Sequence, residues 1–146
     1  AAAPEAADGE RINLWGERFE RPGGGELVMA ELRGKPLLIN FWATWCPPCV
    51  KELPELDRFA RNHAQQLQVI GLAIDSLAPV QEFLKKLPLG FAVGLAGSSG
   101  TELVRALGNR AAALPFTVLL DASGNVVQRK LGETHYDELV AWARGL

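Results

Sequence analysis

Cys46 and Cys49, the only cysteines of the chain, are separated by two prolines. A short, mostly apolar segment at 36–42 precedes them and suits a strand buried on both faces. The segment at about 47–63 repeats apolar residues at helical spacing. Cys46 is therefore expected where a strand passes into a helix, so that free backbone N–H groups and the helix dipole can stabilise a thiolate. This position predicts a redox-active dithiol.

Two other uses of the pair fit less well. A structural disulfide across so short a loop removes little chain entropy, because the entropic gain grows with loop length. A structural zinc site needs about four ligands, and His63 and His135 lie far apart without ligand spacing. No metal ligand is therefore assigned.

Length and composition indicate an ordinary globular protein of 146 residues. We expect a flexible stem at 1–10, which is small and polar, and a single domain at 11–146. The net charge of −2 and the absence of a Lys or Arg block argue against a nucleic-acid partner. No apolar run is long enough to span a bilayer. The Ala-rich start without Met suggests a signal peptide or membrane anchor that has been removed.

Strands and helices are expected to alternate along most of the chain, with a hairpin and a helix at the end. This order predicts an α/β fold with a mixed central sheet and helices on both faces. A short strand is expected at 11–15, Ser76 is expected to cap a helix at about 77–87, and a capping box at 99–102 is expected to open another. Thr134 is expected to start the last helix.

The segment Phe41-Trp42-Ala43-Thr44-Trp45-Cys46-Pro47-Pro48-Cys49, followed by Glu52 and Pro54, resembles the active-site signature of the thioredoxin superfamily. More narrowly, it resembles the TlpA/ResA-like branch of bacterial thiol-disulfide oxidoreductases. The resemblance extends from about residue 26 to the end. It implies a thioredoxin-like fold with an N-terminal extension and a strand–helix insertion at about 90–108.

The two cysteines have different predicted roles. Cys46 starts the helix and is expected to be the exposed, attacking thiol, whereas Cys49 is the buried resolving thiol. Pro47 and Pro48 have no N–H, so the Cys49 amide is the nearest donor to the Cys46 thiolate. Neither spacer residue is basic, which predicts a Cys46 pKa nearer the ~7 of thioredoxin than the ~3.5 of DsbA. A reductase follows, with the disulfide itself in place of a cofactor.

Leu114 and Pro115 stand where thioredoxins carry a cis-proline facing the dithiol, so we expect a cis bond there. The extended backbone at Leu114 could pair with a substrate strand. Trp45 is expected to flank the dithiol as part of an apolar docking surface. The predicted substrate-binding residues are thus Trp45, Pro47, Leu114 and Pro115. Phe116, where the family usually has Thr, is expected to alter the substrate groove.

The sequence does not single out one residue as the acceptor of the Cys49 thiol proton. Thioredoxin has a buried Asp in the strand before its motif, whereas this chain has Asn40, which cannot take a proton in that role. Asp75, at the end of the next strand, and Glu52, on the active-site helix, are the candidate acceptors. A loop carboxylate and a solvated helix face are the alternative interpretations of these two residues.

The resemblance implies a periplasmic or otherwise extracytoplasmic reductase of protein disulfides. It would act as a monomer, receive electrons from a membrane thiol donor, and could be tethered through a removed N-terminal segment. Cytochrome c maturation is one possible use, although 113–116 lacks the Glu usual in that branch. Two alternatives remain: a metal (copper) handling module that uses both thiols, and a redox domain of a larger methionine sulfoxide reductase-type polypeptide.

Overall fold

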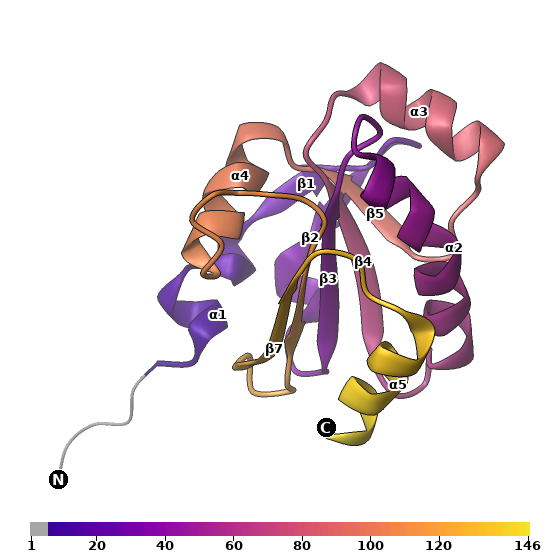
Figure 1. Ribbon diagram of the computed structural model, residues 1–146. Coiled ribbons are helices and arrows are strands. Elements are labelled where there is room, and N and C mark those ends of the chain that lie inside the picture. The colour runs from indigo at the N-terminus through magenta and orange to yellow at the C-terminus, as the bar shows by residue number, and fades with distance from the viewer. Residues whose placement is uncertain (1–5) are drawn as a thin grey trace, which may run out of the picture.

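Seven strands form one sheet in the computed structural model, which describes residues 6–146 (Figure 1). Their order is β2-β1-β5-β4-β3-β6-β7. β3 pairs in parallel with β4 and antiparallel with β6, so the sheet is mixed, as predicted. The strands are β1 (Arg18–Glu20), β2 (Glu26–Val28), β3 (Leu37–Trp42), β4 (Gln68–Ala73), β5 (Ala92–Leu95), β6 (Phe116–Leu120) and β7 (Val126–Leu131).

Helices cover both faces of this sheet, which confirms the predicted thioredoxin-like architecture (Figure 1). They are α1 (Asp8–Arg11), α2 (Pro47–Asn62), α3 (Leu77–Lys86), α4 (Gly97–Ala106) and α5 (Tyr136–Arg144), with 3₁₀ turns η1 (Leu14–Gly16) and η2 (Met29–Leu32). The β5–α4 unit is the strand–helix insertion expected at about 90–108. The hairpin β1–β2 extends the sheet beyond β5.

The alternation of side chains along β3 divides the core into two parts. Leu38 and Trp42 pack with α2, α3 and α5, whereas Leu37, Ile39 and Phe41 pack with α4 and the N-terminal segment. All six residues of β3 are buried, as expected for a central strand. Asn40 is two residues from both Leu38 and Trp42, so it points to the same face of the sheet, which α2 covers.

The N-terminal segment differs from the expected stem and strand. Residues 1–5 lie outside the described residues. Gly9 N–H donates to Gly124 O at 2.9 Å, and Val126 N–H donates to Asp8 Oδ2 at 2.7 Å. Residues 8–10 are therefore held against the β6–β7 turn as part of α1, and the strand expected at 11–15 is replaced by α1 and η1. These contacts satisfy backbone groups that the turn leaves free.

Three helix starts also correct the capping predictions. Ser76 precedes α3, but its side chain makes no capping bond. α4 begins at Gly97, ahead of the expected box. α5 begins at Tyr136 rather than at Thr134.

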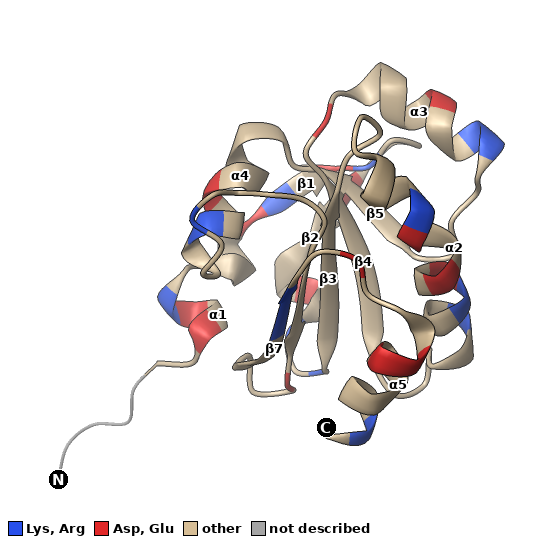
Figure 2. Ribbon diagram, in the orientation of Figure 1, with Lys and Arg blue, Asp and Glu red and all other residues tan. Residues whose placement is uncertain are grey.

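Acidic and basic residues are interspersed over the helices (Figure 2). Across residues 6–146, no helix combines the length and apolar character that crossing a membrane requires. The C-terminus and α1 lie toward the end of the sheet opposite the start of α2 (Figure 1).

Candidate active site

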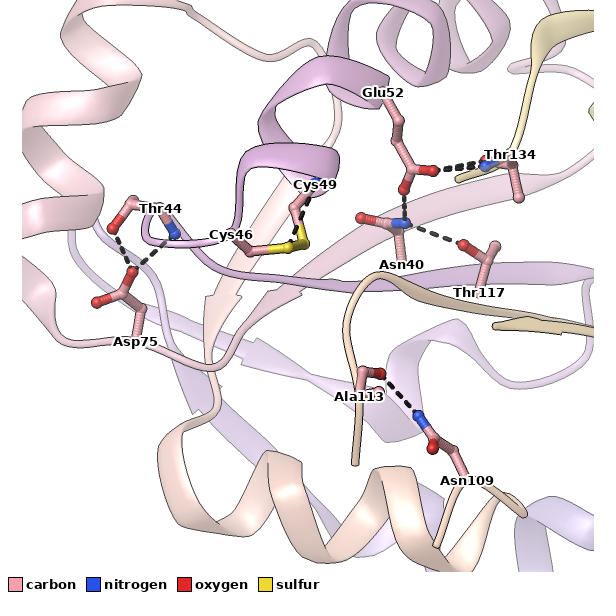
Figure 3. Close-up of a disulfide and its surroundings, with 10 residues drawn as sticks. All are labelled: Asn40, Thr44, Cys46, Cys49, Glu52, Asp75, Asn109, Ala113, Thr117 and Thr134. Carbon is pink, nitrogen blue, oxygen red and sulfur yellow. Dashed lines mark hydrogen bonds between the residues drawn. A yellow bond between two sulfur atoms is a disulfide. The ribbon is translucent and has the colours of Figure 1, made fainter. Parts of the chain in front are cut away.

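A disulfide joins Cys46 and Cys49 at the N-terminus of α2 (Figure 3). Cys46 is the N-cap residue, and its Sγ accepts a hydrogen bond from the Cys49 N–H at 3.4 Å, which is the donor that the prolyl spacer predicts. Pro47 and Pro48 occupy the first helical turn, where N–H groups lack intrahelical partners. Cys46 is 5% exposed and Cys49 is fully buried. Both cysteines are therefore buried in the disulfide form, and the expectation of an exposed Cys46 is not met in this state.

Asp75 holds the loop that leads into the dithiol. Its Oδ2 accepts hydrogen bonds from the backbone N–H of Thr44 at 2.9 Å and from the Thr44 hydroxyl at 2.5 Å. Its Oδ1 accepts from the Ser76 N–H at 2.8 Å. Both oxygens are thus engaged by the backbone around the site. Trp45, which lies between Thr44 and Cys46 in the sequence, is 65% exposed.

Glu52 lies on the opposite side of the disulfide from Asp75 (Figure 3). It is 2% exposed, which excludes the solvated helix face considered from the sequence. Oε1 accepts from Asn40 Nδ2 at 2.5 Å, and Oε2 accepts from the Thr134 N–H at 2.6 Å and hydroxyl at 3.2 Å. Burial raises the pKa of this carboxyl, and the hydrogen bonds that favour the charged form oppose the shift only in part.

Asn40 connects the sheet to Glu52. Its side chain is fully buried, and Nδ2 also donates to Thr117 Oγ1 at 3.0 Å. Within the described chain, Asn40 Oδ1 has no hydrogen-bond partner. Asn40 therefore acts as a donor to the carboxylate rather than as a base, in agreement with its amide chemistry.

The Leu114–Pro115 peptide bond is cis, as predicted. Phe116 pairs with Phe41, so Pro115 comes next to Trp42, the residue that ends β3 and leads into the dithiol loop. Phe116 itself is 3% exposed and stacks on Phe41 with ring centroids 6.0 Å apart. The expectation that Phe116 alters the substrate groove is therefore wrong, because the side chain packs into the core on the other face of the sheet.

The family model described as Redoxin matches residues 17–141, which contain every site element described above. The chain belongs to the Redoxin family.

This Redoxin-family chain is similar to named thiol-disulfide oxidoreductases. It is 30% identical over 118 residues to a ResA of Bacillus cereus, covering 80% of this chain and 66% of ResA. It is 28% identical over 123 residues to sporulation thiol-disulfide oxidoreductase A of Bacillus subtilis, and the match covers 81% of this chain and 72% of that protein. A thioredoxin-family thiol:disulfide interchange protein from Chlorobium tepidum superposes with a TM-score of 0.78 at 26% identity. The superposition covers 99% of this chain and 97% of the Chlorobium chain. The chain spans about two thirds of the ResA length, and the resemblance stated from the sequence is confirmed.

The Redoxin fold brings most of the predicted site residues to one end of the sheet. Cys46, Cys49, Trp45 and Pro47 share the β3–α2 junction, and the register of β6 places Pro115 beside it. Leu114 is half-buried and packs against both core clusters. Among residues 6–146, no three His, Cys, Asp or Glu side chains gather as a metal site.

Sequence reasoning missed three polar residues that position the site. Thr117 and Thr134 are buried and contact Asn40 and Glu52. Asn109 Nδ2 donates to Ala113 O at 2.8 Å and braces the loop just before the cis bond. Only Thr117 had a usable signal, since a polar residue inside an apolar strand needs a buried partner.

Proposed function

We propose that this Redoxin-family protein is a thiol-disulfide oxidoreductase that reduces protein disulfides through Cys46 and Cys49. The observation that carries the proposal is the Cys46–Cys49 disulfide at a helix N-terminus with buried Glu52 one helical turn beyond Cys49. This arrangement supplies a stabilised nucleophile, a shielded second thiol and a nearby base.

The reaction begins from the dithiol. The Cys46 thiolate attacks a client disulfide, the client S–S bond breaks, and a mixed disulfide forms while the second client sulfur leaves as a thiolate. Cys49 then loses its proton and attacks Cys46 Sγ, which releases the other client sulfur. The client gains two electrons and the Cys46–Cys49 disulfide closes. The Cys49 N–H and the helix dipole are placed to stabilise the initial thiolate.

Glu52 is the better of the two proton acceptors for Cys49. It lies three residues further along α2 and so on the same face of the helix. Burial raises the pKa of Glu52, and a base with a raised pKa accepts a proton more readily near neutral pH. Asp75 is hydrogen-bonded through both oxygens as Glu52 is, but it is partly exposed and lies after β4 rather than on the face of α2 that carries Cys49. We therefore assign the proton transfer to Glu52 and loop positioning to Asp75.

The client would bind over the surface around Cys46, where Trp45 and Pro47 are exposed. Trp45 offers an exposed apolar surface on one side, Pro47 is exposed in the first turn of α2, and the half-buried Leu114 lies on the other side, just before the cis bond. We place this reductase outside the cytoplasm, as a monomeric domain at 11–146 that is recharged by a membrane dithiol donor and could be membrane-tethered. The family resemblance supports this setting.

Insulin reduction with dithiothreitol as electron source tests the proposal. We expect wild-type protein to accelerate insulin precipitation, Cys46→Ser to be inactive, and Cys49→Ser to accumulate a covalent adduct with insulin. Cys46→Ser is the matched control for that adduct, since it retains the other thiol. A wild-type rate equal to that of dithiothreitol alone would rule out the reductase assignment.

A further inference from the structure

One buried polar atom beside the dithiol has no partner in the disulfide form. Asn40 is fully buried, and Nδ2 donates to both Glu52 and Thr117, but Oδ1 accepts nothing from residues 6–146. Buried carbonyl oxygens are almost always hydrogen-bonded, because the lost hydration is otherwise uncompensated. An unpaired oxygen here therefore points to a donor that is missing in this redox state.

The geometry directs that oxygen toward the cysteines. Cys49 and Glu52 are three residues apart and lie on the same face of α2, and Glu52 contacts Asn40 directly. Asn40 shares its face of β3 with Leu38 and Trp42, and these two residues pack in the same cluster as Cys49. In Figure 3 the Asn40 oxygen lies on the side facing the disulfide, whereas its nitrogen faces Glu52 and Thr117.

The two redox states differ in what they offer to that oxygen. Disulfide sulfurs carry no hydrogen, so neither can donate. Reduction by a dithiol donor breaks the Cys46–Cys49 S–S bond, passes two electrons from the donor's sulfurs, which become a disulfide, and leaves Cys49 able to carry an S–H. A thiol S–H is a weak donor, but it suits an acceptor that has no other partner.

We propose that Asn40 is a positioning residue whose Oδ1 accepts a hydrogen bond from the Cys49 S–H in the reduced protein. Through Nδ2 the same amide holds Glu52, so that Asn40 fixes the resolving thiol and its base relative to each other. The bond exists only in the dithiol and therefore favours reduction of the pair. This inference rests on the proposed function in one respect, namely that the pair cycles between disulfide and dithiol.

The S–H stretching band of Cys49 gives a direct test. In Cys46→Ser, Cys49 is the sole thiol, so its band is isolated in the infrared spectrum. We expect a band lowered by hydrogen bonding, which moves up to the free-thiol position when Asn40→Leu is added. Adding Thr117→Val instead removes another Asn40 contact but leaves Oδ1 in place, and the band should stay low. A band that Asn40→Leu does not move would overturn the proposal.

A second measurement needs no Asn40 variant and stands even if Asn40→Leu does not fold. The side-chain carbonyl ¹³C resonance of Asn40 should shift between the disulfide and dithiol forms of the wild-type protein. An unchanged resonance would contradict the redox-dependent bond. In a dithiothreitol redox titration, Asn40→Leu should shift the equilibrium toward the disulfide by roughly three- to tenfold relative to Thr117→Val.

Failure of this inference can be told apart from failure of the proposed function. If insulin reduction is intact but the S–H band and the Asn40 resonance do not respond as stated, only the role of Asn40 is wrong. If the band responds while insulin reduction is absent, the hydrogen bond stands and the reductase function fails.

Discussion

Glu52 and Asp75 are two carboxylates on opposite sides of one disulfide, and their surroundings give them different capacities (Figure 3). Asp75 is partly exposed and receives three hydrogen bonds from the surrounding loop. Glu52 is buried, and the loss of hydration raises its pKa although it also receives three hydrogen bonds. The two carboxylates thus receive the same number of hydrogen bonds but differ in burial, and on that difference we base the proposal that Asp75 holds the loop and Glu52 accepts the proton.

The largest expected effect is on the rate at which client is released, which should depend on Glu52 and not on Asp75. Glu52→Gln keeps the side-chain shape but cannot accept the Cys49 proton, so the release of client from the Cys46 mixed disulfide should slow roughly 100-fold. Stopped-flow measurement of single-turnover release from a preformed mixed disulfide checks this. Glu55→Gln on the same helix, which faces His135, is the control and should behave like wild type.

The pH dependence of stability gives the next effect. The Glu52 pKa lies above the ordinary 4.5, so the folded protein holds this proton more tightly than the unfolded chain. The associated stability is fully present below about that ordinary value and is lost as pH rises through the raised folded pKa. Each unit of the rise removes about 1.4 kcal/mol at neutral pH.

Urea unfolding of the disulfide form over this pH range tests that sign. The free energy of unfolding of wild type should fall relative to Glu52→Gln as pH rises. Parallel curves for the two proteins would show that Glu52 is not perturbed by burial.

A smaller effect is expected at the clamp. Asp75→Asn keeps one acceptor for Thr44 but loses the charge that strengthens these bonds, which should lower the free energy of unfolding by about 1–2 kcal/mol. The release step should remain near the wild-type rate. If Asp75→Asn slows release as much as Glu52→Gln does, the division of roles between the two carboxylates is wrong.

Asp8 is a third carboxylate, remote from the dithiol, and gives the smallest effect. The hydrogen bond from Val126 N–H lowers the pKa of Asp8, so its stabilisation is present above the ordinary 3.8 and is lost as pH falls through the lowered value. Asp8→Asn should destabilise the protein by less than about 1 kcal/mol, because the site is near the surface. Urea unfolding at neutral pH and in acid should show the difference only at neutral pH. An equal difference at both would contradict the charge-dependent contact.

The elements that local pattern dictates could be predicted from the sequence. Cys46, Cys49 and the cis bond at Pro115 belong to short motifs, and the strand–helix alternation needs only hydrophobic periodicity. The burial of Glu52 was harder to predict, since a carboxylate on a helix is usually solvated. Its spacing of three from Cys49 and four from Leu56 nevertheless places it on the buried stripe of α2.

Other features depend on contacts between residues distant in sequence. Thr134 has the residue type of a helix cap, but 82 residues separate it from Glu52, which it binds instead. Asp8 binds Val126 across 118 residues, so no local pattern indicated that the first described segment is docked. Such long-range pairing becomes visible only once the sheet order is known.

The most direct test of the account is the titration of Glu52 itself. Selective ¹³C labelling would report the side-chain carboxyl resonance of Glu52 as a function of pH in the disulfide and dithiol forms, with Glu52→Gln assigning the signal. We predict a midpoint above the ordinary glutamate value in the disulfide form and a different midpoint after reduction, because the Cys49 proton then shares its surroundings. An ordinary midpoint that is identical in both forms would contradict Glu52 as the base for the resolving thiol.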